Sequence, residues 1–334
     1  MNIILYNQQP NTSAVNNQLQ VVVNNEPATE RKPFIEANTV ATTLSDIQHN
    51  HIIPVFLKDN EPVISHSEFI ETTYDVVGDV FRAERILSPS IRLSHPIKGR
   101  VPDARNKPAS ELQEWERTIY YERCAFIIEI PTISDAIGGE PLCLSVGGVK
   151  AYNLDNLYNR KGADEHFKLF IGFRVSVCTN LCVWTDGYAG DVRVKSLEQL
   201  KDAIYDLLSH YDAVSDLVRM SRLQELSLTE SQFAQVIGRC RLYQHLPSNL
   251  KREIPELQFG DSQINSVCRD YYRDSSFCRG DNGDINLWRL YNLFTASNKQ
   301  SYIDTFLDRA ANASSFTGEL AYALEHKRHN WFLG

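Results

Sequence analysis

The sequence has no long apolar run of the kind that a membrane protein needs. No segment comes near the roughly eighteen consecutive apolar residues of a membrane span, and the first residues show no basic region followed by an apolar core. We therefore expect neither a transmembrane helix nor a signal peptide, and we expect a cytoplasmic protein without membrane partners. The formal net charge is -8, so any phosphate binding would need a local basic patch.

The sequence also lacks the motifs of common enzyme and nucleotide sites. It contains no GxSxG, Walker loop, GxGxxG or HExxH, and each of these carries a known chemistry. We therefore predict no catalytic residues and no cofactor, and a non-enzymatic protein is the default interpretation. A hydrolase that uses Cys178 or a carboxylate pair ranks third among the hypotheses.

A framework of paired cysteines is missing as well. The seven cysteines are odd in number and scattered, mostly within apolar runs, which suits buried reduced thiols. Cys178 and Cys182 are four residues apart, and in an extended chain they would be roughly 13 Å apart, too far to share one zinc ion. Only a sharp turn at Thr179 and Asn180 would bring them together, and we predict no metal site.

The most informative feature that is present is an alternating segment, HFKLFIGFRVSVCTNLCVWTDG, at residues 166–187. Its apolar residues recur at every second position, which predicts a long strand with one buried face. The other face carries Lys168 and Arg174 around Phe170, and the cluster Cys178, Thr179 and Asn180 follows. We expect a site near this cluster.

The organisation along the chain predicts an α+β fold, in which an antiparallel β-meander is followed by a helical C-terminal region that packs on it. Residues 1–30 are rich in Asn and Gln and are expected to form a flexible arm. Residues 31–195 form the β-rich region, and residues 196–334 form the helical region.

Three runs define the expected meander. Residues 119–130 are β-branched and aromatic up to Pro131, residues 142–146 alternate, and the long strand at residue 166 follows. The glycine pair at 147 and 148 predicts a tight reversal after the second run. Asp186 and Gly187 predict a turn before the last strand.

The helical period begins after Lys195. Ser196 with Gln199 and Thr229 with Gln232 have the spacing of capping boxes, which open amphipathic stretches that continue to about residue 226 and to just before Pro247. Two further helices are expected at residues 285–295 and 302–311.

One loop is basic. Between Arg92 and Lys107 there are five Lys or Arg and one Asp, the composition that binding to a nucleic-acid backbone requires. The candidate contact residues combine this loop with the polar face of the long strand: Lys98, Arg100, Arg105, Lys107, Lys168 and Arg174. Two alternatives stay open. In the first, the loop charges meet the acidic residues Glu111, Glu114 and Glu116; in the second, the C-terminal helices cover the sheet face.

Several segments resemble a Bacteroidetes family named domain of unknown function 3871, over about residues 35–334. They are YYERCAFIIEIP, LSVGGVKAYN, FIGFRVSVCTNLCVWTDG, INLWRLYNLFT and SHPIKGRVPDARNKPASEL. More distantly, the Cys-Thr-Asn cluster and Trp288, Tyr291, Asn292 and Thr295 resemble the phage- and plasmid-like proteins of domain of unknown function 932. The resemblance implies carriage on mobile genetic elements and no established reaction or cofactor.

The leading hypothesis is therefore a mobile-element accessory protein that binds nucleic acid, with single strands as the expected ligand. The alternative is a protein-interaction module that regulates a host or mobile-element protein, which the net acidity and the polar N-terminal segment suit equally well. The sequence does not determine the oligomeric state.

Overall fold

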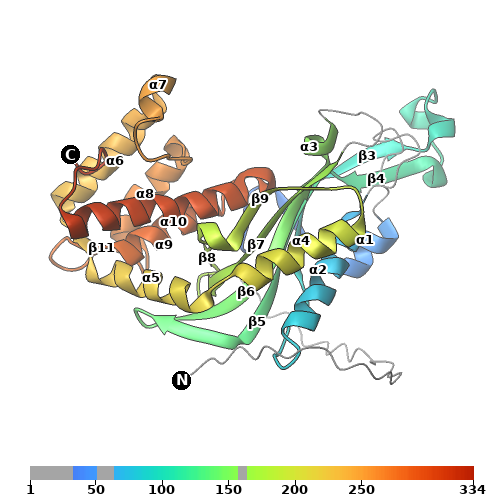
Figure 1. Ribbon diagram of the computed structural model, residues 1–334. Coiled ribbons are helices and arrows are strands. Elements are labelled where there is room, and N and C mark those ends of the chain that lie inside the picture. Colours follow the sequence, from blue (N-terminus) through green and yellow to red (C-terminus); the bar gives the residue numbers. More distant parts are fainter. Residues whose placement is uncertain (1–32, 51–63, 157–163) are drawn as a thin grey trace. The chain divides into compact units, whose positions relative to one another are not determined.

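An antiparallel sheet organises the chain (Figure 1). The computed structural model describes residues 33–50, 64–156 and 164–334, all within the unit Pro33–Gly334. Within these residues the sheet has seven strands in the order β1, β2, β5, β6, β7 and β8, and β9 pairs with β7 as well. The N-terminal arm expected at residues 1–30 lies outside the described residues.

The elements have the following bounds. The strands are β1 Thr39–Thr42, β2 Ser90–Ser94, β3 Pro96–Arg100, β4 Arg117–Tyr121, β5 Arg123–Ile137, β6 Glu140–Ala151, β7 Glu165–Val175, β8 Leu181–Cys182, β9 Tyr188–Val194, β10 Ser227–Leu228 and β11 Ile285–Asn286. The helices are α1 Leu44–Asn50, α2 His66–Val80, α3 Tyr152–Asn156, α4 Leu197–His210, α5 Ala213–Glu225, α6 Glu230–Gln244, α7 Ser248–Lys251, α8 Asp261–Arg273, α9 Leu287–Asn298 and α10 Ile303–His326.

The predicted α+β class and meander are confirmed, because β5, β6 and β7 follow one another in the chain and pair antiparallel. Pro131 does not end the first strand. β5 continues to Ile137, with a shift in its pairing to β6 between Ile130 and Ser134. A bulge of this kind accommodates a proline, which has no N–H to donate to the partner strand.

The glycine pair at 147 and 148 was expected to reverse the chain, and this prediction is wrong. Both glycines lie inside β6, and the reversal from β5 to β6 is at Gly138 and Gly139, whose φ angles are 62° and 83°. A Cβ at Gly148 would lie 2.5 Å from Cζ of Phe69. Glycine is required there for close packing and not for a turn.

Both faces of the sheet are buried, whereas the alternation in β7 predicted one buried face. On one face Phe69 of α2 packs edge-on against Phe126 and Phe167, with ring centroids 5.0 Å and 4.8 Å away. On the other face, Phe170 belongs to a second apolar cluster that the first turns of α10 complete: Ile303, Phe306, Leu307 and Ala310. The polar alternation therefore did not mark a solvated face.

Most of the predicted helix starts are confirmed, because the capping signals that mark them act within one helical turn. The Thr229 and Gln232 side chains form the expected capping box of α6. The stretch expected to continue to residue 226 is two helices, because the Asp212 side chain caps a new helix by accepting from the N–H groups of Val214 and Ser215. The last helix begins near Tyr302 as expected but runs to His326.

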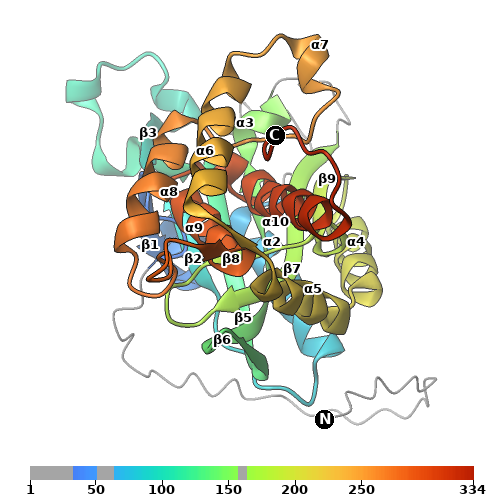
Figure 2. The same cartoon turned by 90° about the vertical axis from the view of Figure 1, so that its left-hand side faces the viewer.

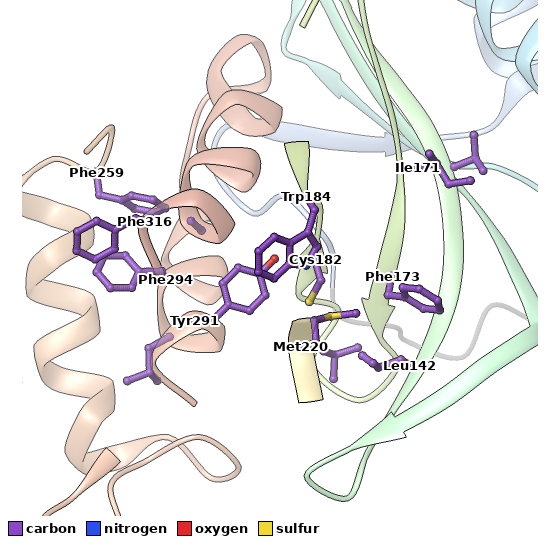
Figure 3. Close-up of a cluster of buried hydrophobic side chains, with 14 of the residues drawn as sticks. Leu142, Ile171, Phe173, Cys182, Trp184, Met220, Phe259, Tyr291, Phe294 and Phe316 are labelled. Carbon is purple, nitrogen blue, oxygen red and sulfur yellow. The ribbon is translucent and has the colours of Figure 1, made fainter. Parts of the chain in front are cut away.

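The helices α5 to α10 gather at one end of the sheet, and α10 runs across it (Figures 1 and 2). Figure 3 shows where the sheet meets the helical region. There Cys182 and Trp184, which follow β7 in the chain, pack against Tyr291 of α9 and Met220 of α5. Among the described residues, no helix is both long enough and apolar enough to cross a membrane.

Candidate nucleic-acid interface

Part of the basic loop forms strand β3, which pairs with β4 in a two-stranded ribbon outside the main sheet, whereas Arg92 lies in β2. We call residues 96–121 the β3–β4 arm. In Figure 1 it lies at the end of the sheet away from α5, α6 and α9. The connection between its strands consists of short 3-10 turns, and its base is tied by the Val101 N–H donating to the Glu116 carbonyl over 2.9 Å.

The pairing register places the charged side chains of the two strands on one face of this ribbon. Lys98 lies opposite Ile119, and Arg100 lies opposite Arg117. Directly paired residues share a face, as do residues two apart in one strand. Lys98, Arg100 and Arg117 therefore lie on one face, whereas the other carries only uncharged side chains: Ile97, Gly99, Thr118 and Tyr120.

The cations of this face are exposed and have no carboxylate partner within the described residues. Arg100 donates to the main-chain carbonyl of Lys107, and Arg117 donates to that of Leu112 over 3.2 Å. Like charges that lie directly opposite each other destabilise a sheet. An anionic ligand would relieve this repulsion, so the cationic face has the electrostatic character of a phosphate-binding surface.

The two remaining loop cations differ in environment. Arg105 is exposed, whereas Lys107 forms an ion pair with Glu116, a residue only 3% exposed. The alternative that the loop charges meet the nearby acidic residues is thus realised for Lys107. Its Nζ still lies 6.0 Å from the ring centroid of Trp115, so this cation and an exposed indole are neighbours.

Lys168 and Arg174 lie away from the arm, and both are buried. The Lys168 ammonium donates to the Asp304 carbonyl over 2.6 Å and pairs with Asp308 of α10. Arg174 pairs with Glu129 of β5. Four of the six predicted residues therefore lie in the arm. Lys168 and Arg174 do not, because each forms an ion pair within the protein.

The Cys-Thr-Asn cluster forms the turn between β7 and β8. Thr179 has a φ of 62°, and its N–H donates to the Val175 carbonyl over 2.9 Å. The Asn180 amide donates to the Oδ1 of Asn292 on α9 over 3.1 Å. The turn therefore docks the helical region on the sheet, and the Asn180 and Asn292 segments that share the distant resemblance contact each other.

Cys178 of this turn is partly buried, and Cys182 of β8 is fully buried. Burial raises the pKa of the Cys178 and Cys182 thiols above the usual value. A nucleophilic cysteine needs a lowered pKa, so the local environment works against reaction at Cys178. In the part of the chain that the structure describes, no three His, Cys, Asp or Glu side chains gather closely enough to hold a metal ion.

One carboxylate pair was missed by the sequence reasoning. Asp216 is fully buried on α5, where Arg219 donates to it over 2.7 Å and to Asp186 over 2.9 Å. Burial, and next the negative charge of Asp186, raise the pKa of Asp216 to about 7. The available signal was its position: Asp216, Met220 and Leu223 share the helical spacing of one stripe, and all three are buried.

Asp216→Asn is expected to stabilise the protein increasingly as the pH rises from about 4 to 7. The folded pKa lies above the unfolded value of 3.8, so the contribution of Asp216 is fully present below pH 3.8 and is lost as the pH rises through about 7. The amide carries no charge to bury, and its advantage over the wild type should reach on the order of 3–4 kcal/mol. Urea unfolding at several pH values measures it.

The exposed Asp202 on α4 provides the control, because Asp202→Asn removes the same charge without burial. Its effect on the free energy of unfolding should hardly change with pH. A pH-independent difference between Asp216→Asn and the wild type would show that Asp216 is ionised throughout this range.

Arg117 is a second residue that the sequence reasoning did not include. It lies ten residues after Lys107, among acidic residues, and only the strand pairing shows that it joins Lys98 and Arg100. The available signal was the β-branched and aromatic run Thr118, Ile119 and Tyr120, which is typical of a strand and which Arg117 directly precedes.

The comparison with models of known protein families gives a match over nearly the whole chain. The model of one protein family, described as "Domain of unknown function, B. Theta Gene description (DUF3871)", matches residues 15–333. No significant match was found among curated proteins or among solved structures. The distant likeness to domain of unknown function 932 stays a prediction.

Proposed function

The chain belongs to the DUF3871 family, and for this member we propose that the β3–β4 arm binds the backbone of nucleic acid. The role would be that of an accessory protein of a mobile genetic element, as the sequence resemblance implies. The proposal rests on one observation above all: Arg100 lies directly opposite Arg117, with Lys98 on the same face.

The interface consists of this cationic face together with the connection, which adds Arg105 and Lys107. Cations of this kind displace the counterions of a phosphate backbone, and backbone binding carries no sequence preference by itself. We leave Lys168 and Arg174 out of the interface, since both side chains are buried in ion pairs. The overall charge of -8 would make binding depend strongly on this local surface.

The triple variant Lys98→Ala, Arg100→Ala, Arg117→Ala tests the proposal. Each phosphate contact contributes about 0.7 to the slope of log K against log salt for single strands, so three lost contacts should reduce the slope by roughly 2. Fluorescence anisotropy with labelled single-stranded and duplex oligonucleotides, from low to moderate salt, measures both the affinity and the slope.

The matched control removes three exposed cations elsewhere, Arg193, Lys195 and Lys201. This variant changes the net charge by the same amount and should keep the slope of the wild type. If both variants weaken oligonucleotide binding equally, the loss comes from the change in net charge and not from the arm. Absence of binding to either kind of strand at low salt would contradict the proposal.

A protein-interaction module is the competing function, and the two exposed isoleucines of the arm bear on it. Ile97 and Ile119 are each 38% exposed, but their pairing partners place them on opposite faces of the ribbon. They therefore do not form the contiguous apolar patch that marks a typical protein interface. The cationic face favours nucleic acid.

A further inference from the structure

Trp115 has a surface position that the backbone-binding proposal does not explain. It is 73% exposed in the 3-10 turn Glu114–Glu116 of the arm, whereas Trp184 and Trp288 are 9% and 2% exposed. An indole is a large apolar group that usually gains stability from burial, so a position this open leaves its faces available to a ligand.

Two cations lie near Trp115, which is itself flanked in the chain by Glu114 and Glu116. Lys107 Nζ lies 6.0 Å from the ring centroid, and the Arg100 side chain donates to the main-chain carbonyl of the same lysine. The ion pair of Lys107 with Glu116 fixes the lysine beside the ring. The turn therefore holds a flat aromatic surface directly before Arg117, at the point where the connection joins the cationic face.

A nucleotide matches this arrangement, because its planar base can stack on the indole while its phosphate contacts the cationic face. In a duplex the base faces are stacked on each other, whereas in a single strand they are open to aromatic side chains. The cationic face by itself would accept either form of nucleic acid. An exposed indole next to it adds binding energy only where a base face is free.

We infer that the ligand of the β3–β4 arm is single-stranded nucleic acid and that Trp115 stacks on one of its bases. This inference rests on the proposed function. Stacking on Trp115 is tolerant of sequence, since every base has an aromatic face. The arm therefore binds exposed single strands of DNA or RNA in general, with the phosphates on Lys98, Arg100 and Arg117.

Trp115→Ala and Trp115→Phe test the inference in the full-length chain. Loss of one stacked base should weaken binding to oligo(dT) and to oligo(U) about 5- to 150-fold. The phenylalanine variant should recover most of this loss, and duplex binding should change by less than about twofold under the same conditions. Intrinsic tryptophan fluorescence of the wild type should be quenched by oligo(dT), and the quenching should disappear in both variants.

The control is Tyr272→Ala, which removes an exposed aromatic residue of α8. It should leave the affinity for oligo(dT) and the quenching unchanged. Thermal melting should show that Trp115→Ala folds like the wild type, because the side chain contributes little buried surface.

The outcomes separate the two proposals. If the triple cation variant loses binding while Trp115→Ala binds oligo(dT) like the wild type, backbone binding stands and stacking by Trp115 is wrong. If the wild type binds duplex as tightly as single strands, the inferred preference is wrong. If it binds no oligonucleotide at low salt, both proposals fail.

Discussion

Lys150→Ala is expected to lower the free energy of unfolding by about 3–5 kcal/mol. Lys150 of β6 is fully buried, and its ammonium lies 2.7 Å from the Glu165 carboxylate and 3.3 Å from that of Asp155. Glu165 is itself only 1% exposed. Removing the cation takes an ion-pair partner from two carboxylates at once, one of them buried, which costs far more than the loss of a surface ion pair.

A double variant separates charge from packing. Lys150→Met keeps most of the apolar stem. Adding Glu165→Gln removes the buried negative charge, while the amide oxygen can still accept from the Ile64 N–H, which donates to Glu165 over 3.0 Å in the wild type. We expect the double variant to regain a large part of the stability that Lys150→Met loses. Urea unfolding of the two variants measures the difference. A double variant no more stable than Lys150→Met would show that packing, and not charge, makes Lys150 important.

Gly147→Ala is expected to destabilise the protein by about 3 kcal/mol or more. A Cβ at this position would lie 2.0 Å from the carbonyl oxygen of Phe126 and 2.9 Å from the ring of Phe170. The oxygen belongs to the neighbouring strand β5, so the clash is with backbone and no rotamer change relieves it. Unfolding followed by circular dichroism measures the loss, and the midpoint should fall markedly.

Gly78→Ala is the matched control, since the same Cβ added to α2 meets nothing within 4 Å. Alanine is the better helix former, and this variant should gain roughly 0.5–1 kcal/mol. Similar losses at both glycines would mean that the close approach of β5 and β6 does not control the effect.

Local signals in the sequence were reliable where the physics is local. The Thr229 and Gln232 capping box needs only residues of one helical turn, and it opens α6 as predicted. The alternation in β7 likewise predicted a strand, because side-chain direction follows from the backbone itself. The meander followed from the order of such strands.

Glycine and lysine were ambiguous because distant residues decide their roles. A glycine pair suits a chain reversal and close packing of a side chain against the strand equally well. Only the position of Phe69 shows that Gly148 allows close packing. Lys168 has a strand position that would be solvated on an open sheet. It is buried because α10, some 136 residues later in the chain, brings the Asp304 carbonyl to it.

The sequence by itself determined the α+β class, the meander and most helix starts, since hydrophobic period and capping act over a few residues. It also located the basic loop. Only the tertiary structure decided which cations share a surface, because strand pairing places Arg117 beside Arg100 and helix packing buries Lys168. Side-chain exposure depends on contacts between residues far apart in sequence, and no local pattern records those contacts.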